Sequence, residues 1–485
     1  ADMIIKGVLD SDGAIGIATY NNGQKASKID VYGDADIEET VLVNIEGQSY
    51  LPGQDYNFLV ADNIDGELGT QPGDYFSGFL NVGIITDNST VSMYRANNIG
   101  AMDGNQQAIY NSLDTIYNNT DAAGKGRVGK VYSLGTASAK EALTDMSSGT
   151  AMSAGLVMRQ NTVMNALTAR HRYLTHQANV PVNVPMSSLV NNYTATAPKP
   201  SASSADPGLS LIVPVELSEG GGLWFKFAKG WGSYGGDVSG HGFTASVGAD
   251  YVASPKWKLG ALYSFSKQSY GGQGDHRDTK DHRFGLYGDW RVGPHSAFLY
   301  VGAGWQNHDQ KRHFYAGDNY NAKADYSGKT IEFNGRYSYD LDYGKQGWHN
   351  KPFASFQAVH YRQGAYSETG AYEFGQVVDS GSSTYTAAAI GWDFARDFGK
   401  DGYVEVELGV SRTLGGANPC YGARLAGGGE KFSMRSRSMD KTRVLLGIYG
   451  SRAISDRWRV GGELGVAQGP HDRDITASVS LRLSW

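Results

Sequence analysis

From residue 222 to the C-terminus, apolar and polar side chains alternate with a period of two in segments of about ten residues. In the clearest segment Phe284 and Leu286 share one face, whereas Arg283 and Asp289 share the other. A period of two with charges on the second face is typical of β-strands. Three further segments repeat this alternation: 331–340, 404–411 and 457–466. The pattern predicts a series of strands separated by turns.

Both a soluble β-sandwich and a membrane β-barrel contain strands with one apolar face. The second face carries too many charges for the core of a sandwich, which favours the barrel. Tryptophans near the strand ends also suit the interface girdles of a membrane barrel: Trp224, Trp257, Trp290, Trp305, Trp392 and Trp458. Short connections such as Gly293-Pro294 alternate with longer ones, which we expect at 272–280, 309–327, 366–383 and 414–432. At about 22 residues for each strand and its connection, residues 222–485 predict roughly twelve antiparallel strands in an all-β membrane protein.

The N-terminal part of the chain has a different pattern. In residues 1–100, short apolar runs are separated by Gly, Asp and Asn. These runs predict short strands, which fit the end of a β-solenoid or a small β-sandwich. Residues 101–148 predict a helical connecting region, in which Ile109, Leu113 and Ile116 form an apolar stripe.

Two segments lie between this helical region and the barrel. Within residues 149–178, the stretch from Met152 to His176 predicts a helix of ~25 residues, which is long enough to cross a membrane. This helix is too polar for lipid because Arg159, Arg170 and Arg172 interrupt its apolar residues. Residues 179–221 are rich in Pro, Ser and Ala and predict an extended linker.

Composition and charge argue against several classes of function. The 485 residues include 43 Lys and Arg against 49 Asp and Glu, so the net charge of −6 predicts no nucleic-acid surface. No stretch of ~18 apolar residues is present, which excludes a helical membrane protein. The single Cys420 cannot form an internal disulfide. We find no motif for an activated nucleophile, a nucleotide or a metal ion, and we expect no catalytic residue, no cofactor and no enzyme activity.

Several stretches resemble one known family. The stretch Gly222-Leu223-Trp224-Phe225-Lys226 is similar to the opening strand of an autotransporter β-domain. The stretch LPGQDYNFL at 51–59 is similar to the C-terminal end of AIDA- and pertactin-like passengers. The order of solenoid end, helices, polar helix, linker, barrel and terminal aromatic resembles a classical (type Va) autotransporter over nearly the whole chain.

This resemblance implies a location and a function. Periplasmic chaperones and the barrel assembly machinery would deliver the barrel into the lipid of the outer membrane of a Gram-negative bacterium. The N-terminal passenger would then emerge through the barrel and remain anchored at the cell surface, with residues 1–100 as its autochaperone-like end. The chain would thus secrete its own N-terminal region by type V secretion.

The resemblance also assigns roles to individual residues. Helix 149–178 would occupy the lumen, where Arg159, Arg170 and Arg172 would face inward acids, because charges in a narrow pore need partners. The expected lumen acids are Asp289, Glu332, Asp340, Glu405, Glu407 and Glu463. Simple solvation of these acids in a wet lumen is the alternative. A last strand that ends in an aromatic residue resembles the signal read by the assembly machinery, here formed by Val479, Leu481, Leu483 and Trp485.

Two other functions remain open at this point. The N-terminal region is, in one alternative, a complete small adhesive head that binds host surface ligands and contributes to virulence. In the other, the barrel anchors a displayed enzyme whose catalytic domain precedes residue 1.

Overall fold

The computed structural model describes two long stretches of the chain. The first is 3–147, apart from 18, 21–24, 39–40, 45–55, 67–68, 71–77, 85–89, 96 and 98. The second is 221–485, apart from 236–237, 273, 399–401, 417–418 and 436–439. The predicted polar helix (149–178) and nearly all of the predicted linker (179–221) therefore lie outside the described residues. None of the described helices combines the length and the apolar character needed to span a membrane.

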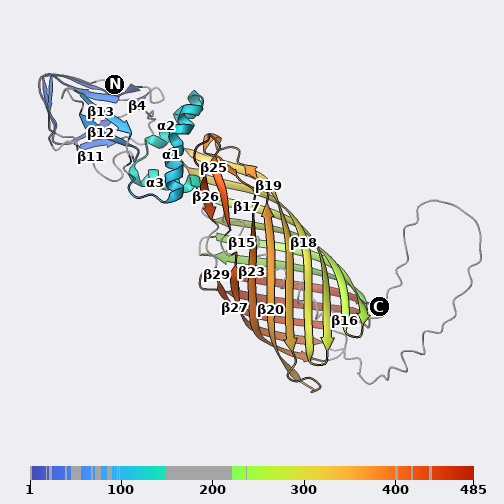
Figure 1. Ribbon diagram of the computed structural model, residues 1–485. Helices are drawn as coiled ribbons and strands as arrows, with labels where there is room; N and C mark the ends of the chain where they lie inside the picture. Colours follow the sequence, from blue (N-terminus) through green and yellow to red (C-terminus); the bar gives the residue numbers. More distant parts are fainter. Residues whose placement is uncertain are drawn as a thin grey trace, which may run out of the picture.

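Twelve antiparallel strands form a closed barrel (Figure 1). The first and last strands complete the circle, with Gly222 paired to Ser484 and Tyr234 paired to Asp472. In chain order the strands are β14 (Gly222–Tyr234), β15 (Val238–Ser254), β16 (Trp257–Gly272), β17 (Asp275–Val292), β18 (His295–Tyr315), β19 (Asn319–Tyr339), β20 (Trp348–Gln363), β23 (Gly381–Asp397), β24 (Tyr403–Gly415), β27 (Thr442–Ala453), β28 (Trp458–Gln468) and β29 (Asp472–Ser484). The predicted barrel and its strand number are confirmed.

Side chains along each strand alternate between the two faces of the barrel wall. Leu286 of β17 and Ile331 of β19 are 67% and 63% exposed. Arg283 and Glu332, on the opposite face of the same two strands, are buried. Because a closed sheet encloses only one face, the buried polar residues line the lumen and the exposed apolar residues face outward. The prediction that the apolar face lies outside is confirmed.

The two ends of the barrel differ. Short turns such as 255–256 and 293–294 join the strands at one end, where Gly221 and Trp485 also lie, joined by a backbone hydrogen bond. We call the opposite end the mouth. β18 and β19 are each 21 residues long and meet at the mouth, whereas β28 has 11 residues.

The prediction of a long loop is wrong for two of the four stretches. Most of 272–280 belongs to β17, and only 316–318 separate β18 from β19 within the expected loop 309–327. The parts of β17 and β18 in these stretches have mostly polar residues on both faces, such as Gln310 inside and Lys311 outside, so no apolar face marks them in the sequence. In β19 the apolar residues Tyr320, Ala322, Ala324 and Tyr326 face inward, which reverses the pattern of the wall nearer the short-turn end.

The other two expected loops fold into a small sheet at the mouth. Its four strands pair in the order β21 (Tyr366–Ser367), β22 (Gln376–Val378), β25 (Cys420–Leu425) and β26 (Phe432–Arg435). A short 3₁₀ helix, η2 (Tyr372–Phe374), lies between β21 and β22. The mouth therefore carries an ordered platform.

Three helices lie between the mouth and the N-terminal strands (Figure 1). They are α1 (Gly104–Asn119), α2 (Ala122–Tyr132) and α3 (Thr136–Ser147). Asp103 begins α1 with a capping box, in which its carboxylate accepts from the backbone of Gln106 and the Gln106 side chain accepts from the backbone of Asp103. The predicted apolar stripe of α1 is buried, including Ile109, Leu113 and Ile116.

The N-terminal strands are short and stack mainly in parallel. The triplets β1–β3, β6–β8 and β9–β11 each contribute one strand to three parallel sheets, whose strand orders are β1-β6-β9, β2-β7-β10 and β3-β8-β11. Strands β13 and β12 extend the first sheet in antiparallel. The bounds are β1 (Met3–Lys6), β2 (Leu9–Asp10), β3 (Ala14–Ile17), β4 (Thr19–Tyr20), β5 (Lys25–Ala26), β6 (Ile29–Tyr32), β7 (Asp34–Asp36), β8 (Val41–Asn44), β9 (Tyr56–Val60), β10 (Asn63–Asp65), β11 (Gly69–Thr70), β12 (Leu80–Ile84) and β13 (Thr90–Arg95).

One apolar core joins these parts. It includes Phe58 from the N-terminal strands, Ile116 and Met146 from the helices, and Tyr320 and Phe374 from the mouth. Because these side chains are buried against one another, the helices are packed on the mouth and are not merely tethered to it.

Candidate functional site

The lumen wall carries most of the predicted acids. The side chains of Asp289, Glu332, Glu405, Glu407 and Glu463 are all buried on the inner face of the barrel. Each lies at an inward position of its strand, as the alternation predicts. A buried carboxylate needs a cation or hydrogen-bond donors.

Asp340 lies elsewhere. It follows the last residue of β19 and is only partly buried. Its carboxylate accepts a hydrogen bond from the backbone of Asp342 and contacts Nδ1 of His349 at 2.9 Å. Asp340 therefore stabilises the turn between β19 and β20 at the short-turn end.

Basic residues of the barrel itself pair with the lumen acids. These cations also occupy inward positions, and the acid lies on the same strand for Asp281, three strands away for Glu407 and two strands away for the others. The pairs are Lys226–Glu463 (3.0 Å), Arg283–Asp281 (2.6 Å), Arg283–Glu332 (3.0 Å), Arg336–Asp393 (2.5 Å), Arg336–Glu407 (2.6 Å), Arg443–Asp474 (2.9 Å) and Arg482–Asp250 (2.6 Å). The lumen is therefore lined by ion pairs that brace the wall from within.

Arg336 shows how such a pair is built. Its guanidinium lies 3.5 Å from the centre of the Phe353 ring and donates to Asp393 of β23 and Glu407 of β24. The Phe353 ring lies close above Gly391, where a Cβ would come within 2.7 Å of the ring. Glycine at this position leaves room for the Phe353 ring, on which Arg336 stacks beside its two acids.

The alternation along each strand indicates which of these cations face inward. Arg283 and Arg336 have the same strand parity as the acids, so their inward position can be predicted. Their partners cannot, because Arg336 reaches past β20 to Asp393. The expected partners in the pore helix, Arg159, Arg170 and Arg172, lie outside the described residues, and their pairing stays a prediction.

At the mouth, α2 is held by a charged contact with η2. Arg127 donates from Nε and Nη2 to the two carboxylate oxygens of Glu373, at 2.8 and 2.6 Å. Its guanidinium also stacks 4.2 Å from the ring centre of Tyr372, a residue held at φ 51°, where non-glycine residues are uncommon. The Thr120 hydroxyl donates to Glu373 as well, at 2.9 Å.

Burial alone would raise the pKa of Glu373. The hydrogen bonds from Arg127, from its own backbone and from Thr120, together with the charge of Arg127, outweigh burial and hold the pKa of this carboxyl below its usual value. Glu373 is therefore ionised at neutral pH, and its charge favours the docked position of α2.

The other two helices contact the mouth through hydrogen bonds. The side-chain amide of Asn105 in α1 exchanges two hydrogen bonds with the backbone of Ser433, at 2.7 and 3.0 Å. The C-terminal carbonyls of α3 accept hydrogen bonds from the barrel and from the small sheet at the mouth. Arg312 Nη1 of β18 donates to Asp145 and Gln376 Nε2 of β22 donates to Met146, both at 2.8 Å. These donors satisfy carbonyls that a helix C-terminus leaves unpaired.

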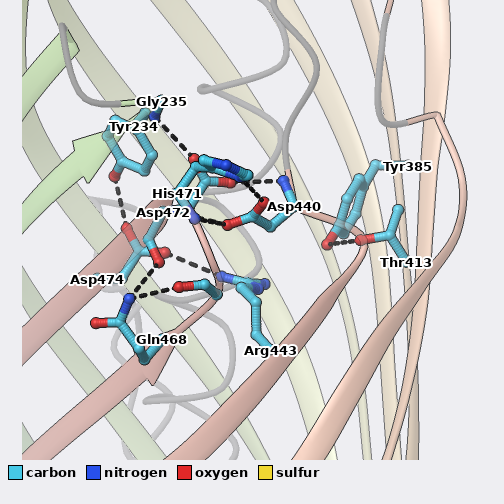
Figure 2. A network of polar contacts seen from close by, with 11 residues as sticks. Tyr234, Gly235, Tyr385, Thr413, Asp440, Arg443, Gln468, His471, Asp472 and Asp474 are labelled. Atoms are coloured by element: carbon cyan, nitrogen blue, oxygen red, sulfur yellow. Dashed lines mark hydrogen bonds and ion pairs between the residues drawn. The ribbon is translucent and has the colours of Figure 1, made fainter.

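A polar network fastens the rim of the mouth where the barrel closes (Figure 2). The Asp472 carboxylate accepts from the backbone of Gly235 at 3.1 Å and of Asp440 at 2.6 Å. The Tyr234 hydroxyl donates to Asp474 at 2.6 Å. Tyr234 is the last residue of the first barrel strand and Gly235 follows it, whereas Asp472 and Asp474 belong to the last strand. The network therefore holds the closing strands together at this end.

A family model described as the autotransporter beta-domain matches residues 223–465, which is half of the chain. The chain belongs to the autotransporter family. This agrees with the closed barrel, its polar lumen and the ordered segment at its mouth. The barrel of this autotransporter is an outer-membrane translocator of type V secretion from a Gram-negative bacterium.

Solved autotransporter structures are among the matches. The translocator domain of NalP from Neisseria meningitidis matches with a TM-score of 0.47 and 11% identity, covering 67% of this chain and 98% of that one. The transport unit of AIDA-I from Escherichia coli matches with a TM-score of 0.41 and 13% identity, covering 57% and 93%. The Bordetella BrkA β-domain matches with a TM-score of 0.40 and 15% identity, covering 55% and 99%. A search of curated proteins finds no match.

Proposed function

We propose that this autotransporter secretes its own N-terminal region through the barrel and holds it at the cell surface, with α1–α3 docked on the mouth. The observation that carries the proposal is the position of two ends of the described chain. Ser147 ends α3 at the mouth, next to the contacts of Arg312 and Gln376, whereas Gly221 lies at the short-turn end. Residues 148–220 must therefore connect opposite ends of the barrel.

The lumen is the direct route for this connection. Its wall offers charged groups at many levels, which suits a polar segment with Arg159, Arg170 and Arg172. We propose that 149–178 occupies the lumen as a helix after secretion. The stacked parallel strands of residues 3–70 then form the surface-exposed end of a β-solenoid passenger.

The proposal includes partners for assembly. Val479, Leu481 and Leu483 are at outward positions of β29, and Trp485 follows the strand. We propose that this outward row is read by the barrel assembly machinery after periplasmic chaperones deliver the chain. The role of the whole chain is then transport and display, without catalysis.

The single cysteine provides a direct test of orientation. Cys420 is exposed on β25 at the mouth. We expect a membrane-impermeant maleimide to label Cys420 on intact cells. In the matched control C420S/K256C, the thiol lies in an exposed short turn at the other end, and labelling should require permeabilised cells. Labelling of K256C but not of Cys420 on intact cells would reverse the orientation and contradict the proposal.

A further inference from the structure

Two lysines lie directly opposite each other on the outer wall of the barrel. The register of β16 and β17 pairs Lys267 with Lys280, and both side chains are exposed at outward positions. Like charges at directly opposite positions destabilise a sheet. Among the described residues neither lysine has an ion-pair partner. In the barrel by itself, the repulsion between the two lysines therefore destabilises the sheet.

A second pair of like charges lies on the same wall. The register of β19 and β20 places Lys329 opposite Arg362, again at exposed outward positions and without an ion pair among the described residues. Trp305 of β18 is paired with Lys329 on one side and with His282 of β17 on the other. We call Lys267, Lys280, Lys329 and Arg362 the basic row.

The height of the basic row relative to the apolar band can be derived from the strands. Lys267 and Lys280 are each ten residues from the paired Trp257 and Trp290 near the short-turn end, and Lys329 is ten residues from Tyr339. Ten residues at ~3.4 Å each, in strands tilted by ~40°, rise about 26 Å. The apolar band of an outer-membrane barrel is ~25 Å tall. The basic row therefore lies where the acyl chains end and the lipid headgroups begin, on the mouth side.

We propose that the basic row binds the phosphate groups of a phosphorylated membrane lipid in the leaflet next to the mouth. A phosphate between two opposed cations offsets their repulsion, and basic residues at a membrane surface attract anionic headgroups. Trp305 supplies an amphipathic ring at the same level, as residues of the interface do. The identification of this leaflet as the outer one rests on the proposed function.

A matched control pair lies farther from the apolar band on β18 and β19. Lys311 of β18 and Lys323 of β19 also form an exposed, directly opposed pair. Lys323 is six residues beyond Lys329, which places it ~15 Å farther from the apolar band by the same geometry. Between the two levels runs an acidic row of Asp278, Asp309 and Asp325. The outer pair has the same charge as the inner one but does not reach the headgroup level.

The experiment measures lipid binding to the purified full chain in a neutral detergent by native mass spectrometry. The probes are a diphosphorylated glycolipid, its dephosphorylated form and inorganic phosphate. We expect the K267Q/K280Q variant to bind the diphosphorylated glycolipid about thirtyfold more weakly than the unaltered chain, and K311Q/K323Q to bind within about twofold of it. The dephosphorylated lipid should bind equally weakly to all three proteins. Each protein is first checked for the compact mobility of a folded barrel on unheated gels.

Equal binding of the phosphorylated lipid by both variants would overturn the proposal. So would inorganic phosphate binding as tightly as the lipid, since the ligand would then be a soluble anion. A dimer that forms through this wall and is lost in K267Q/K280Q would identify a second copy as the occupant and also overturn it. Lipid binding in detergent does not depend on membrane orientation, so its failure leaves the proposed function standing, which the Cys420 labelling tests separately.

Discussion

Arg482 in the last barrel strand forms a two-point ion pair with Asp250 of β15, with Nη2–Oδ1 at 2.6 Å and Nη1–Oδ2 at 2.8 Å. To reach Asp250 the guanidinium passes over Gly222 of β14, where a Cβ would lie 2.6 Å from the Arg482 Cζ atom. The pair thus spans the seam between β14 and β29 at the short-turn end. With the Tyr234–Asp474 contact at the mouth, it fastens the closing strands at both ends.

We therefore expect Arg482→Ala to weaken barrel closure. The substitution leaves the Asp250 carboxylate buried without its cation, a change that typically costs about 3–5 kcal/mol. Denaturant unfolding of the purified barrel should show a loss of this size, and a larger share of the protein should migrate as unfolded on unheated gels. Arg457→Ala, in the exposed turn before β28, is the control and should change little. Equal stability of the two variants would show that the pair does not fasten the seam.

Two glycines of α2 give a matched test of helix docking. A Cβ at Gly124 would lie 2.5 Å from Oε1 of Glu373 and 1.9 Å from Oγ1 of Thr120, whereas a Cβ at Gly126 meets open space. We expect Gly124→Ala to loosen the docked helices and to make 101–147 more sensitive to added protease. Gly126→Ala should stabilise α2 by up to ~1 kcal/mol through helix propensity. If both variants resist protease alike, the close fit at Gly124 has no role in docking.

The contact between Arg127 and Glu373 should make docking depend on pH. The pKa of Glu373 lies below its usual value, so the stabilisation is complete above the unfolded pKa of about 4.3 and is lost as the pH falls through the lower folded pKa. Pulsed EPR distances between spin labels on Cys420 and on A123C should be narrow at pH 7 and broaden in acid. Because glutamine does not ionise, the distance distribution of Glu373→Gln should differ less between pH 7 and acid than that of the wild type. A wild-type distance distribution that does not change down to pH 3 would contradict the assignment.

The predicted pairing of the pore segment with the lumen wall is open to a conductance test. Reversing Glu405 and Glu407 to Lys would repel Arg159, Arg170 and Arg172, and we expect ion conductance in planar bilayers to rise. Arg336→Ala is the control, because it removes a barrel partner of Glu407 and keeps both acids. Unchanged conductance in the Lys variant, or an equal rise in Arg336→Ala, would count against pairing with the pore segment.

The period of two, together with the length of residues 222–485, was sufficient to predict the barrel, its twelve strands and the inward position of five of the six named acids. Phe284 and Leu286 alternate with Arg283 and Asp289 because one wall face meets lipid and the other meets the lumen, and this contrast is visible residue by residue. The apolar stripe of α1 was visible for the same reason, since Ile109, Leu113 and Ile116 repeat at helical spacing.

The register between strands could not be predicted. Arg336 and Asp393 are far apart in the chain and meet only because β19, β20 and β23 pair in one alignment. The mouth was also missed, because the strands near Gln310 and Lys311 have no apolar face to mark them. The docking of α2 includes the contact of Arg127 with Glu373, which lies in a stretch that the sequence suggests is a loop.

The most direct test of secretion and surface display is protease treatment of intact cells that carry an epitope tag at Ala1. The account predicts that the tag is lost while a barrel fragment resists digestion, because the N-terminal strands and α1–α3 lie outside the cell and the barrel is protected by the membrane. A tag that survives on intact cells and is lost only after the outer membrane is permeabilised would place the N-terminal region in the periplasm and contradict the account.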